Sequence, residues 1–292
     1  MNRIEKWGKI IGVLICLVFV IFPAANGTAQ FTLFGLILLS IGIPHGAIDH
    51  LISDPHLDRI GLGKFLGIYL TLVGAYLFTW YLFPIFALIA FLMMSAYHFG
   101  QSHFLDQNMP MTQTWLLYLS RGGFFLFSIL LGDWEATKYI LSTLLNLDYL
   151  DHHRPMILGV LLTITLAIQW NIGLKFNRLQ LFELITLGLL LYFSPLLIGF
   201  VVYFGFWHAL PSMMTEYRYL SRFTDYNSFK KFTIQLLPFS LISFFGIGIL
   251  LILGLNFLST SELILLFFVL ISLISFPHIL YMDRFLRKQN QN

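Results

Sequence analysis

The chain has 292 residues, of which 58% are hydrophobic and only 11% are charged. Soluble domains carry about 25% charged residues, so this chain has too few to cover a surface in water. Its mean hydropathy of +0.81 agrees. The composition excludes an ordinary soluble enzyme, a nucleic-acid-binding protein and a disordered chain, and it predicts an all-α polytopic membrane protein. Cys16 is the single cysteine, so a metal here must be held by histidine and carboxylate rather than by thiolates.

Ten apolar stretches are long enough, or nearly so, to cross a bilayer, which takes about 20 residues. They are residues 9–25, 30–49, 65–83, 84–102, 114–131, 155–170, 181–194, 196–217, 232–256 and 262–282. Prolines and short polar runs separate them, as is typical of turns and helix starts. Residues 133–150 are typical of a short interfacial amphipathic helix. We find no soluble domain and no internal repeat, and we predict a single transmembrane domain, residues 1–292, built as a bundle of about ten helices.

The basic residues predict the orientation of this bundle. With ten spans both termini lie on one side, and that side holds all but three of the 17 Lys and Arg residues. Lys138 and Arg154 lie on the other side. Arg121 lies within a span, where it either snorkels or pairs with an intramembrane acid. Because cytoplasmic loops collect Lys and Arg, we predict cytoplasmic termini and a multi-pass protein of the cell (plasma) membrane.

Residues 1–29, which hold the first span, allow a second interpretation. Their apolar core, residues 10–22, is short, and Pro23, Ala24 and Ala25 offer a site to a signal peptidase. Removal of this segment would leave the orientation of the other spans unchanged.

Four of the nine histidines fall at one depth in the predicted bundle. His45, His98, His208 and His278 lie in the second, fourth, eighth and tenth spans, which all run from outside to inside. Each is about 12–17 residues from the outer end of its span, or roughly 18–26 Å at the helical rise. Ionisable groups inside a membrane usually face the bundle interior and mark function. We predict that the four imidazoles share one metal site in the cytoplasmic half of the membrane. The alternative is that each one only hydrogen-bonds a neighbouring helix.

The residues around these histidines suit a metal. Asp49 follows His45 by four residues, on the same helix face, so it either orients a neighbouring ligand or binds the metal itself. Pro44 and Pro277 each precede a histidine, and a proline kink opens a helix and frees a carbonyl. Histidines without thiolate fit iron, copper or zinc.

The other histidines are expected to lie away from the metal. His50 and His103 come five residues after His45 and His98, about 140° round the helix from them, and are expected at the interface. Glu216 ends the eighth span, either at its rim or behind the site. The remaining histidines are expected in solvated loops: His56, His152 and His153.

Five motifs resemble, in chain order, those of the bacterioopsin-related (Brp/Blh) family. They are Gly-Ile-Pro-His45-Gly-Ala-Ile-Asp49, Tyr-His98-Phe-Gly100, Arg121-Gly-Gly, Phe-Trp-His208 and Pro-His278-Ile-Leu-Tyr-Met-Asp283. The region that resembles the family is residues 30–284. Members of the family are membrane-embedded β-carotene 15,15'-dioxygenases.

The resemblance implies an enzyme that uses Fe(2+) and O₂ to split the central double bond of β-carotene into two retinal molecules. It also implies that His45, His98 and His208 are metal ligands. The expected partners are β-carotene or a related carotenoid, O₂, the lipid bilayer and an opsin that accepts the retinal, and no nucleic acid. Because β-carotene dissolves only in the bilayer, a site inside the membrane suits this substrate.

Two positions depart from the family pattern. The family's fourth ligand is a histidine four residues after the third, where this chain has Ser212. An acidic residue soon after the His-Phe-Gly motif is replaced by His103. Three alternatives follow: three histidines are the whole ligand set, or His278, His50 or His103 supplies the missing ligand, or cleavage is altered or lost. The expected metal ligands are His45, His98, His208 and His278. The other expected residues of the catalytic site are Asp49 and Ser212.

Other functions remain as alternatives. A non-cleaving relative that binds a metal or an isoprenoid is favoured by Ser212. A secondary transporter would use ionisable residues at broken helices, but the lack of a repeat and the off-centre histidines argue against it. A bis-histidine haem carrier would be identified by its visible absorption.

Overall fold

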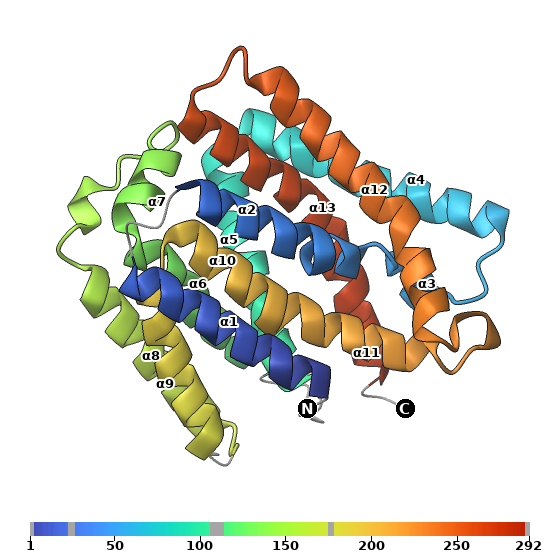
Figure 1. Ribbon diagram of the computed structural model, residues 1–292, viewed down its shortest axis with the longest axis horizontal. Coiled ribbons are helices and arrows are strands. Elements are labelled where there is room, and N and C mark those ends of the chain that lie inside the picture. Colours follow the sequence, from blue (N-terminus) through green and yellow to red (C-terminus); the bar gives the residue numbers. More distant parts are fainter. Residues whose placement is uncertain (1–2, 23–26, 106–113, 175–177, 290–292) are drawn as a thin grey trace. The chain divides into compact units, whose positions relative to one another are not determined.

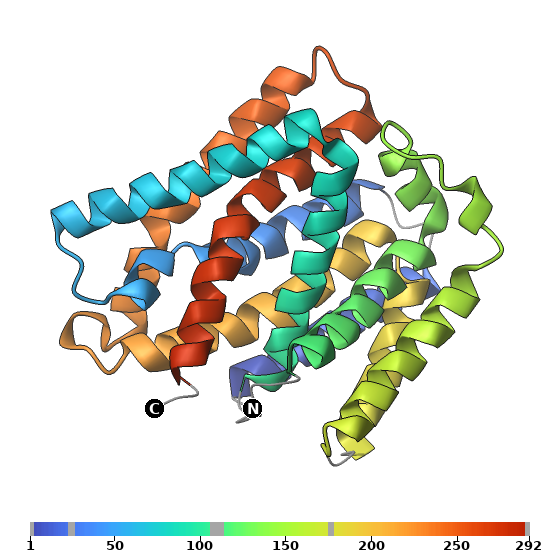
Figure 2. The same cartoon turned by 180° about the vertical axis from the view of Figure 1, so that it is seen from behind.

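The computed structural model describes residues 3–22, 27–105, 114–174 and 178–289, and every regular element within them is a helix (Figures 1 and 2). Seven helical segments are long and apolar enough to cross a membrane. They are Gly27–Ser53, Arg59–Leu82, Pro84–Phe104, Thr114–Gly132, Leu196–Leu220, Phe229–Gly254 and Thr260–Gln289. The protein is therefore an all-α polytopic membrane protein. The peptidase site expected at residues 23–25 lies outside the described residues.

Three of the ten predicted spans correspond to helices that are not among these seven. They are α1 (Arg3–Ile21), α8 (Arg154–Asn171) and α9 (Arg178–Phe193). The helix α9 has only 16 residues, and α1 begins with charged residues at positions 3, 5 and 6. The count of ten spans and the cytoplasmic termini therefore stay predictions.

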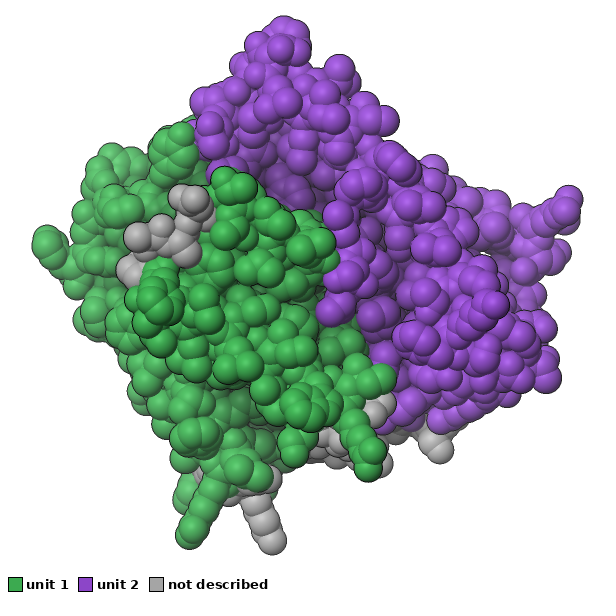
Figure 3. Space-filling view, viewed as in Figure 1, with its two compact units in different colours: residues 1–38, 92–211 green, residues 39–91, 212–292 purple. Residues whose placement is uncertain are grey.

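The chain divides into two compact units (Figure 3). Unit 1 comprises Met1–Leu38 and Leu92–Pro211, and unit 2 comprises Leu39–Phe91 and Ser212–Asn292. Three long helical segments each contribute residues to both units: Gly27–Ser53, Pro84–Phe104 and Leu196–Leu220. The assignment of residues 1–292 to a single transmembrane domain stays a prediction.

Unit 1 is held together by close helix contacts. Unit 1 contains α1, α8 and α9, which were described above, and the part of α5 (Pro84–Gln101) from Leu92 onward. Its other elements are α2 (Gly27–Ile37), η3 (Ser102–Phe104), α6 (Thr114–Gly132), α7 (Trp134–Leu141), η4 (Asp148–Leu150), α10 (Leu196–Val202) and η5 (Tyr203–Ala209). The helix α6 packs against α8 and α9, and α10 packs against α1 and α2. A Cβ atom on Gly122 of α6 would lie 1.8 Å from the carbonyl oxygen of Ala96 on α5. Such backbone contact is how helices associate where the hydrophobic effect gives no preference for helix over lipid.

Arg121 lies in the interior of unit 1 rather than at its edge. Its side chain is 3% exposed, and Nη1 donates a hydrogen bond of 3.4 Å to Oε1 of Gln169. The guanidinium also lies 5.4 Å from the centre of the Phe104 ring. Arg121 therefore does not snorkel.

Unit 2 is built around α13. Its elements are η1 (Leu38–Gly42), η2 (Pro44–Gly46), α3 (Asp49–Ser53), α4 (Arg59–Leu82), α11 (Leu210–Leu220), η6 (Thr224–Tyr226), α12 (Phe229–Gly254) and α13 (Thr260–Gln289). The helix α13 packs against α3, α4 and α12 (Figures 1 and 2). The indole of Trp80 donates a 2.9 Å hydrogen bond to the hydroxyl of Ser272, which joins α4 to α13. A capping box of Ser259 and Glu262 starts α13.

The second predicted span is not one continuous α-helix. After α2 the chain passes through the π-helical turn η1 and the 3₁₀ turn η2 before α3 begins. Pro44 explains the interruption, because it has no N–H to donate and its ring clashes with the preceding turn. The 3₁₀ turn that results carries His45.

Candidate metal centre

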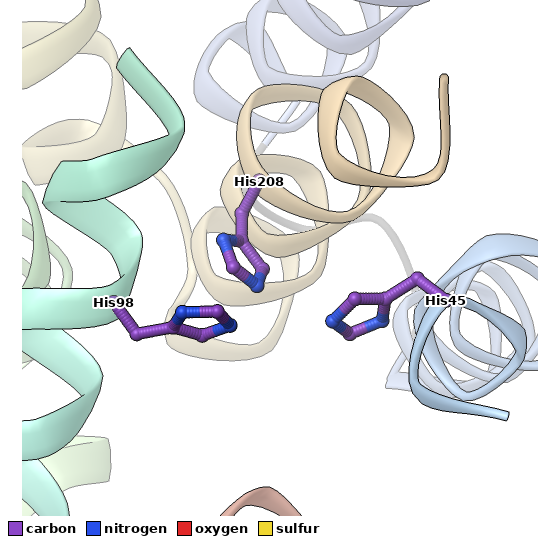
Figure 4. A group of neighbouring side chains, drawn as sticks. All are labelled: His45, His98 and His208. Atoms are coloured by element: carbon purple, nitrogen blue, oxygen red, sulfur yellow. The ribbon is translucent and has the colours of Figure 1, made fainter. Parts of the chain in front are cut away.

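Unit 1 brings together two of the predicted ligands, His98 and His208. His98 lies near the end of α5 and His208 lies in η5. Their ring centres are 4.4 Å apart, with the ring planes at 72°, and the two residues are 3% and 1% exposed. In Figure 4 the rings of His98 and His208 are turned toward each other. Two helices therefore present two buried imidazoles to one point.

Hydrogen bonds at Nδ1 fix which nitrogen of each ring carries the proton. Nδ1 of His98 lies 3.2 Å from Oε1 of Gln101, and the amide nitrogen of Gln101 donates to the hydroxyl of Tyr97. Since Oε1 can only accept, Nδ1 of His98 must donate. Nδ1 of His208 lies 2.6 Å from Oγ of Ser102, and Ser102 in turn donates to the backbone carbonyl of His98. In the neutral form both rings then carry the lone pair on Nε2.

His208 lies in a π-helical interruption of a long helical segment. Within Leu196–Leu220, residues Tyr203–Ala209 form η5 between α10 and α11. Single π-helical turns inside α-helices often occur at functional sites. The rings of Phe99 and Phe204 pack against His208, with centres 4.8 and 5.5 Å from it. His208 is thus enclosed by apolar rings and by the polar contacts at Nδ1.

Unit 2 brings together the other two predicted ligands, His45 and His278. Their ring centres are 4.7 Å apart, with the planes nearly perpendicular at 85°, and they are 5% and 3% exposed. Nδ1 of His45 donates to the carbonyl of Gly42, at the end of the π-helical turn. A Cβ atom on Gly46 would meet Nδ1 of His278 at 3.4 Å, so the glycine allows the His278 ring to lie against η2.

Asp49 orients His278. Its Oδ1 accepts a hydrogen bond of 2.7 Å from Nδ1 of His278, and the Asp49 side chain is 2% exposed. A carboxylate that accepts from Nδ1 fixes the tautomer with the lone pair on Nε2, which is the usual arrangement behind a histidine that binds metal. Of the two interpretations of Asp49 drawn from the sequence, this geometry favours the orienting one.

All four histidines therefore have the same arrangement within their units. In each case an oxygen of the protein engages Nδ1, and Nε2 is the nitrogen that can act as a ligand. His45, His98 and His208 are all buried, and each offers a ring nitrogen to a metal (Figure 4). The donor set fits a metal ion that accepts neutral imidazole.

The other histidines are engaged elsewhere. Nε2 of His103 lies 3.0 Å from the hydroxyl of Tyr203, and the His103 ring stacks on Phe125 with centres 4.9 Å apart. His50 packs against Phe239 at 4.9 Å. The three histidines expected in solvated loops, His56, His152 and His153, are exposed.

Two polar side chains on α11 are also buried. Ser212, at the position of the family's fourth ligand, is 1% exposed. Glu216, one turn further along α11, is 0% exposed, and neither of its carboxylate oxygens has a hydrogen-bond partner among the described residues. The rim position that the sequence allowed for Glu216 is therefore wrong, and the residue is buried.

Sequence reasoning missed the residues that engage Nδ1 in unit 1. Gln101, the last residue of α5, and Ser102, the first residue of η3, follow His98 by three and four residues, which is the spacing of neighbours on one helix face. This spacing from His98 is the feature of the sequence from which the two residues could have been predicted.

Comparison with known families decides between the interpretations of the motifs. The family described as Beta-carotene 15,15'-dioxygenase matches residues 36–285. The chain belongs to this family. A β-carotene 15,15'-dioxygenase from the uncultured marine bacterium 66A03 is 33% identical over 187 residues. The aligned part covers 59% of this chain and 64% of that protein. No solved structure matches the chain.

The match to the β-carotene 15,15'-dioxygenase family includes every motif that the sequence suggested, from Gly42 to Asp283. It begins at residue 36, within α2. The helix α1 therefore lies outside the part of the chain that the family defines.

Proposed function

We propose that this chain is a dioxygenase that splits the central double bond of β-carotene with O₂ to give two retinal molecules. Membership of the family over residues 36–285 supports the reaction. The observation that carries the proposal is the set of four buried histidines that all have Nδ1 engaged by an oxygen. A dioxygenase needs such a set to hold its metal, whereas histidines that only join helices need no common tautomer.

We propose that His45, His98 and His208 bind one Fe(2+) through Nε2 and that His278 is the fourth ligand. The donor chemistry supports iron, since sites of neutral imidazole without thiolate accept it. Bound iron would supply the activation of O₂. Ser212 and Asp49 belong to the same site in this proposal, Asp49 as the residue that orients His278.

The protein's own residues hold and shield the ligands. Gln101, Ser102 and Asp49 accept hydrogen bonds from the Nδ1–H groups of His98, His208 and His278, which fixes the ring orientations and raises the basicity of the Nε2 atoms. Phe99 and Phe204 pack on the His208 ring, where they exclude water and present an apolar surface to a polyene. Held in register beside the metal, the middle of the substrate would gain rate from proximity and orientation.

The bilayer supplies the substrate in this proposal. β-Carotene is a hydrocarbon that partitions into the membrane, and the protein crosses the membrane several times. We place the enzyme in the plasma membrane with both termini cytoplasmic, because most Lys and Arg residues fall in the loops of one side. O₂ is the co-substrate, and an opsin that accepts retinal is the expected recipient of the product.

Expression in bacteria that accumulate β-carotene tests this function. We expect the cells to lose their yellow colour and to accumulate retinal, measured by chromatography of the extracted pigments. A His98→Ala variant expressed to the same level should leave the pigment intact. Unchanged pigment in cells with well-expressed wild-type protein would contradict the proposal. Products of another chain length would show that the enzyme cleaves a different double bond.

A non-cleaving membrane relative is the second candidate, and Ser212 favours it. If His278 is the fourth ligand, His278→Ala should lower the iron content of the purified protein, and Ser212→His should give no gain. A Ser212→Phe variant controls for the added volume at this buried position. A rise in iron content or turnover in Ser212→His alone would show instead that the fourth position is vacant in the natural protein.

A further inference from the structure

The π-helical segment η5 is held by residues of α1 and α9 that meet at Trp207, the neighbour of His208. The Nε1–H of Trp207 donates a hydrogen bond of 2.7 Å to Oε1 of Glu183 on α9. Nζ of Lys9 on α1 forms an ion pair of 2.6 Å with the same oxygen and lies 5.6 Å from the centre of the Trp207 ring. One carboxylate oxygen thus ties three helical segments together within unit 1.

The backbone of α1 lies against the same segment. A Cβ atom on Gly12 would come within 2.9 Å of Cζ3 of Trp207 and 3.0 Å of Cδ2 of Phe206. A Cβ atom on Gly8 would come within 2.5 Å of a methyl group of Leu210. Two glycines one turn apart on α1 therefore form a flat face on which η5 rests, and Trp207 is 4% exposed as a result.

These contacts bear on His208 because a π-helical turn is a rare, local interruption of an α-helix, frequent at functional sites. The side chains that such a turn presents depend on the contacts around it as well as on its own hydrogen bonds. Trp207 is the residue directly before His208, and its ring is bonded at one edge and packed on one face. Fixing Trp207 fixes the turn from which His208 reaches His98 and Ser102.

We propose that Lys9, Glu183 and Trp207 are positioning residues that hold His208 in its metal-binding orientation. In this proposal α1 supports the metal centre through Lys9. This inference rests on the proposed function. It extends that function to a helix outside residues 36–285, the part matched by the family. The ion pair is only partly buried, with Lys9 at 24% and Glu183 at 29% exposure, so its main role is to hold the indole rather than to stabilise the fold by charge.

Cobalt(II) binding to the purified full-length protein in detergent tests the proposal. The visible d–d spectrum of Co(II) reports ligand geometry, and titration gives its dissociation constant. Glu183→Ala and Trp207→Phe should each weaken Co(II) binding about ten- to a hundredfold, the usual effect of losing a residue that orients a ligand, and should change the spectrum. The double variant should lose no more than either single variant, because both remove the same contact. Glu183→Gln should recover most of the affinity, since its amide oxygen still accepts from Trp207.

Matched variants separate positioning from folding. Lys9→Met should weaken Co(II) binding, whereas Lys6→Met, on the exposed face of the same helix, should not. Gly12→Ala should weaken it, whereas Gly35→Ala, where a Cβ meets nothing within 4 Å, should not. If Glu183→Ala does not purify, Trp207→Phe and Lys9→Met carry the test.

The outcomes distinguish the two proposals. Variants that lower the melting temperature but keep the wild-type cobalt spectrum and affinity would overturn the positioning role and leave the dioxygenase proposal in place. Wild-type protein that binds no cobalt would overturn the metal centre and the positioning role together.

Discussion

Replacement of any one of three histidines by alanine should leave the protein without iron. We expect His45→Ala, His98→Ala and His208→Ala each to lower bound iron to background, measured by elemental analysis of protein purified without oxygen. Retinal formation should fall by more than about a hundredfold, because losing a ligand costs more than losing a residue that orients one. Each ring is buried with Nδ1 already engaged, so its Nε2 is the nitrogen that the substitution removes from the metal.

His152→Ala is the matched control for these variants. His152 is an exposed histidine between η4 and α8, and its loss should change neither iron content nor turnover. Full iron in any one of the three ligand variants would remove that histidine from the site. Because His45 belongs to unit 2 and the other two to unit 1, the same measurement tests whether both units serve one metal.

The second large effect is expected at Gly122. In Gly122→Ala the new methyl group would lie 1.8 Å from the carbonyl oxygen of Ala96 and 2.6 Å from the backbone nitrogen of Gly100. Backbone atoms cannot move aside as a flexible side chain can, so α5 and α6 must separate. We expect a loss of about 3 kcal/mol or more in stability, at the upper end for overpacked interiors, with a large fall in iron content because α5 carries His98. Thermal unfolding in detergent measures the first effect.

Gly123→Ala is the control that the sequence itself supplies. Its Cβ would meet only the Cβ of Ala96, at 3.9 Å, which is an ordinary contact. Alanine is also the better helix former by about 1 kcal/mol, so this variant should be as stable as the natural protein or slightly more so. Equal destabilisation by both substitutions would contradict the backbone contact between α5 and α6.

The class of fold and the nearness of these histidines to one another were predictable from the sequence for a clear physical reason. Apolar length reports membrane helices directly, and counting residues along a span gives depth. Depth alone placed the four histidines in one layer, and the structure brings His98 within 5 Å of His208 and His45 within 5 Å of His278, between ring centres. The convergence of both pairs on one ion stays a prediction.

The rotation of each helix about its axis was not open to prediction in the same way. In a membrane both faces of a helix are apolar, so the hydrophobic pattern does not say which face meets which neighbour. The contact of Lys9 with Glu183 joins residues 174 positions apart, and no local sequence pattern predicts it. The interruptions at η1 and η5 were hidden for a similar reason. Pro44 marks the first and Pro211, two residues after η5, marks the second, but a proline does not say that the interrupted turn is π-helical.

The π-helical segment Tyr203–Ala209 has a consequence for insertions and deletions. A π-helix holds one more residue per turn than the α-helix from which it is formed. Deleting one residue between Tyr203 and Phe206 would let the chain return to α-helical winding and would leave His208 facing nearly the same direction relative to α10, because fewer residues then complete each turn. Deleting a residue from the α-helix α10 would instead turn His208 by about 100°. Relatives that are one residue shorter within this π-helical segment are thus expected to keep the histidine as a ligand in an uninterrupted α-helix.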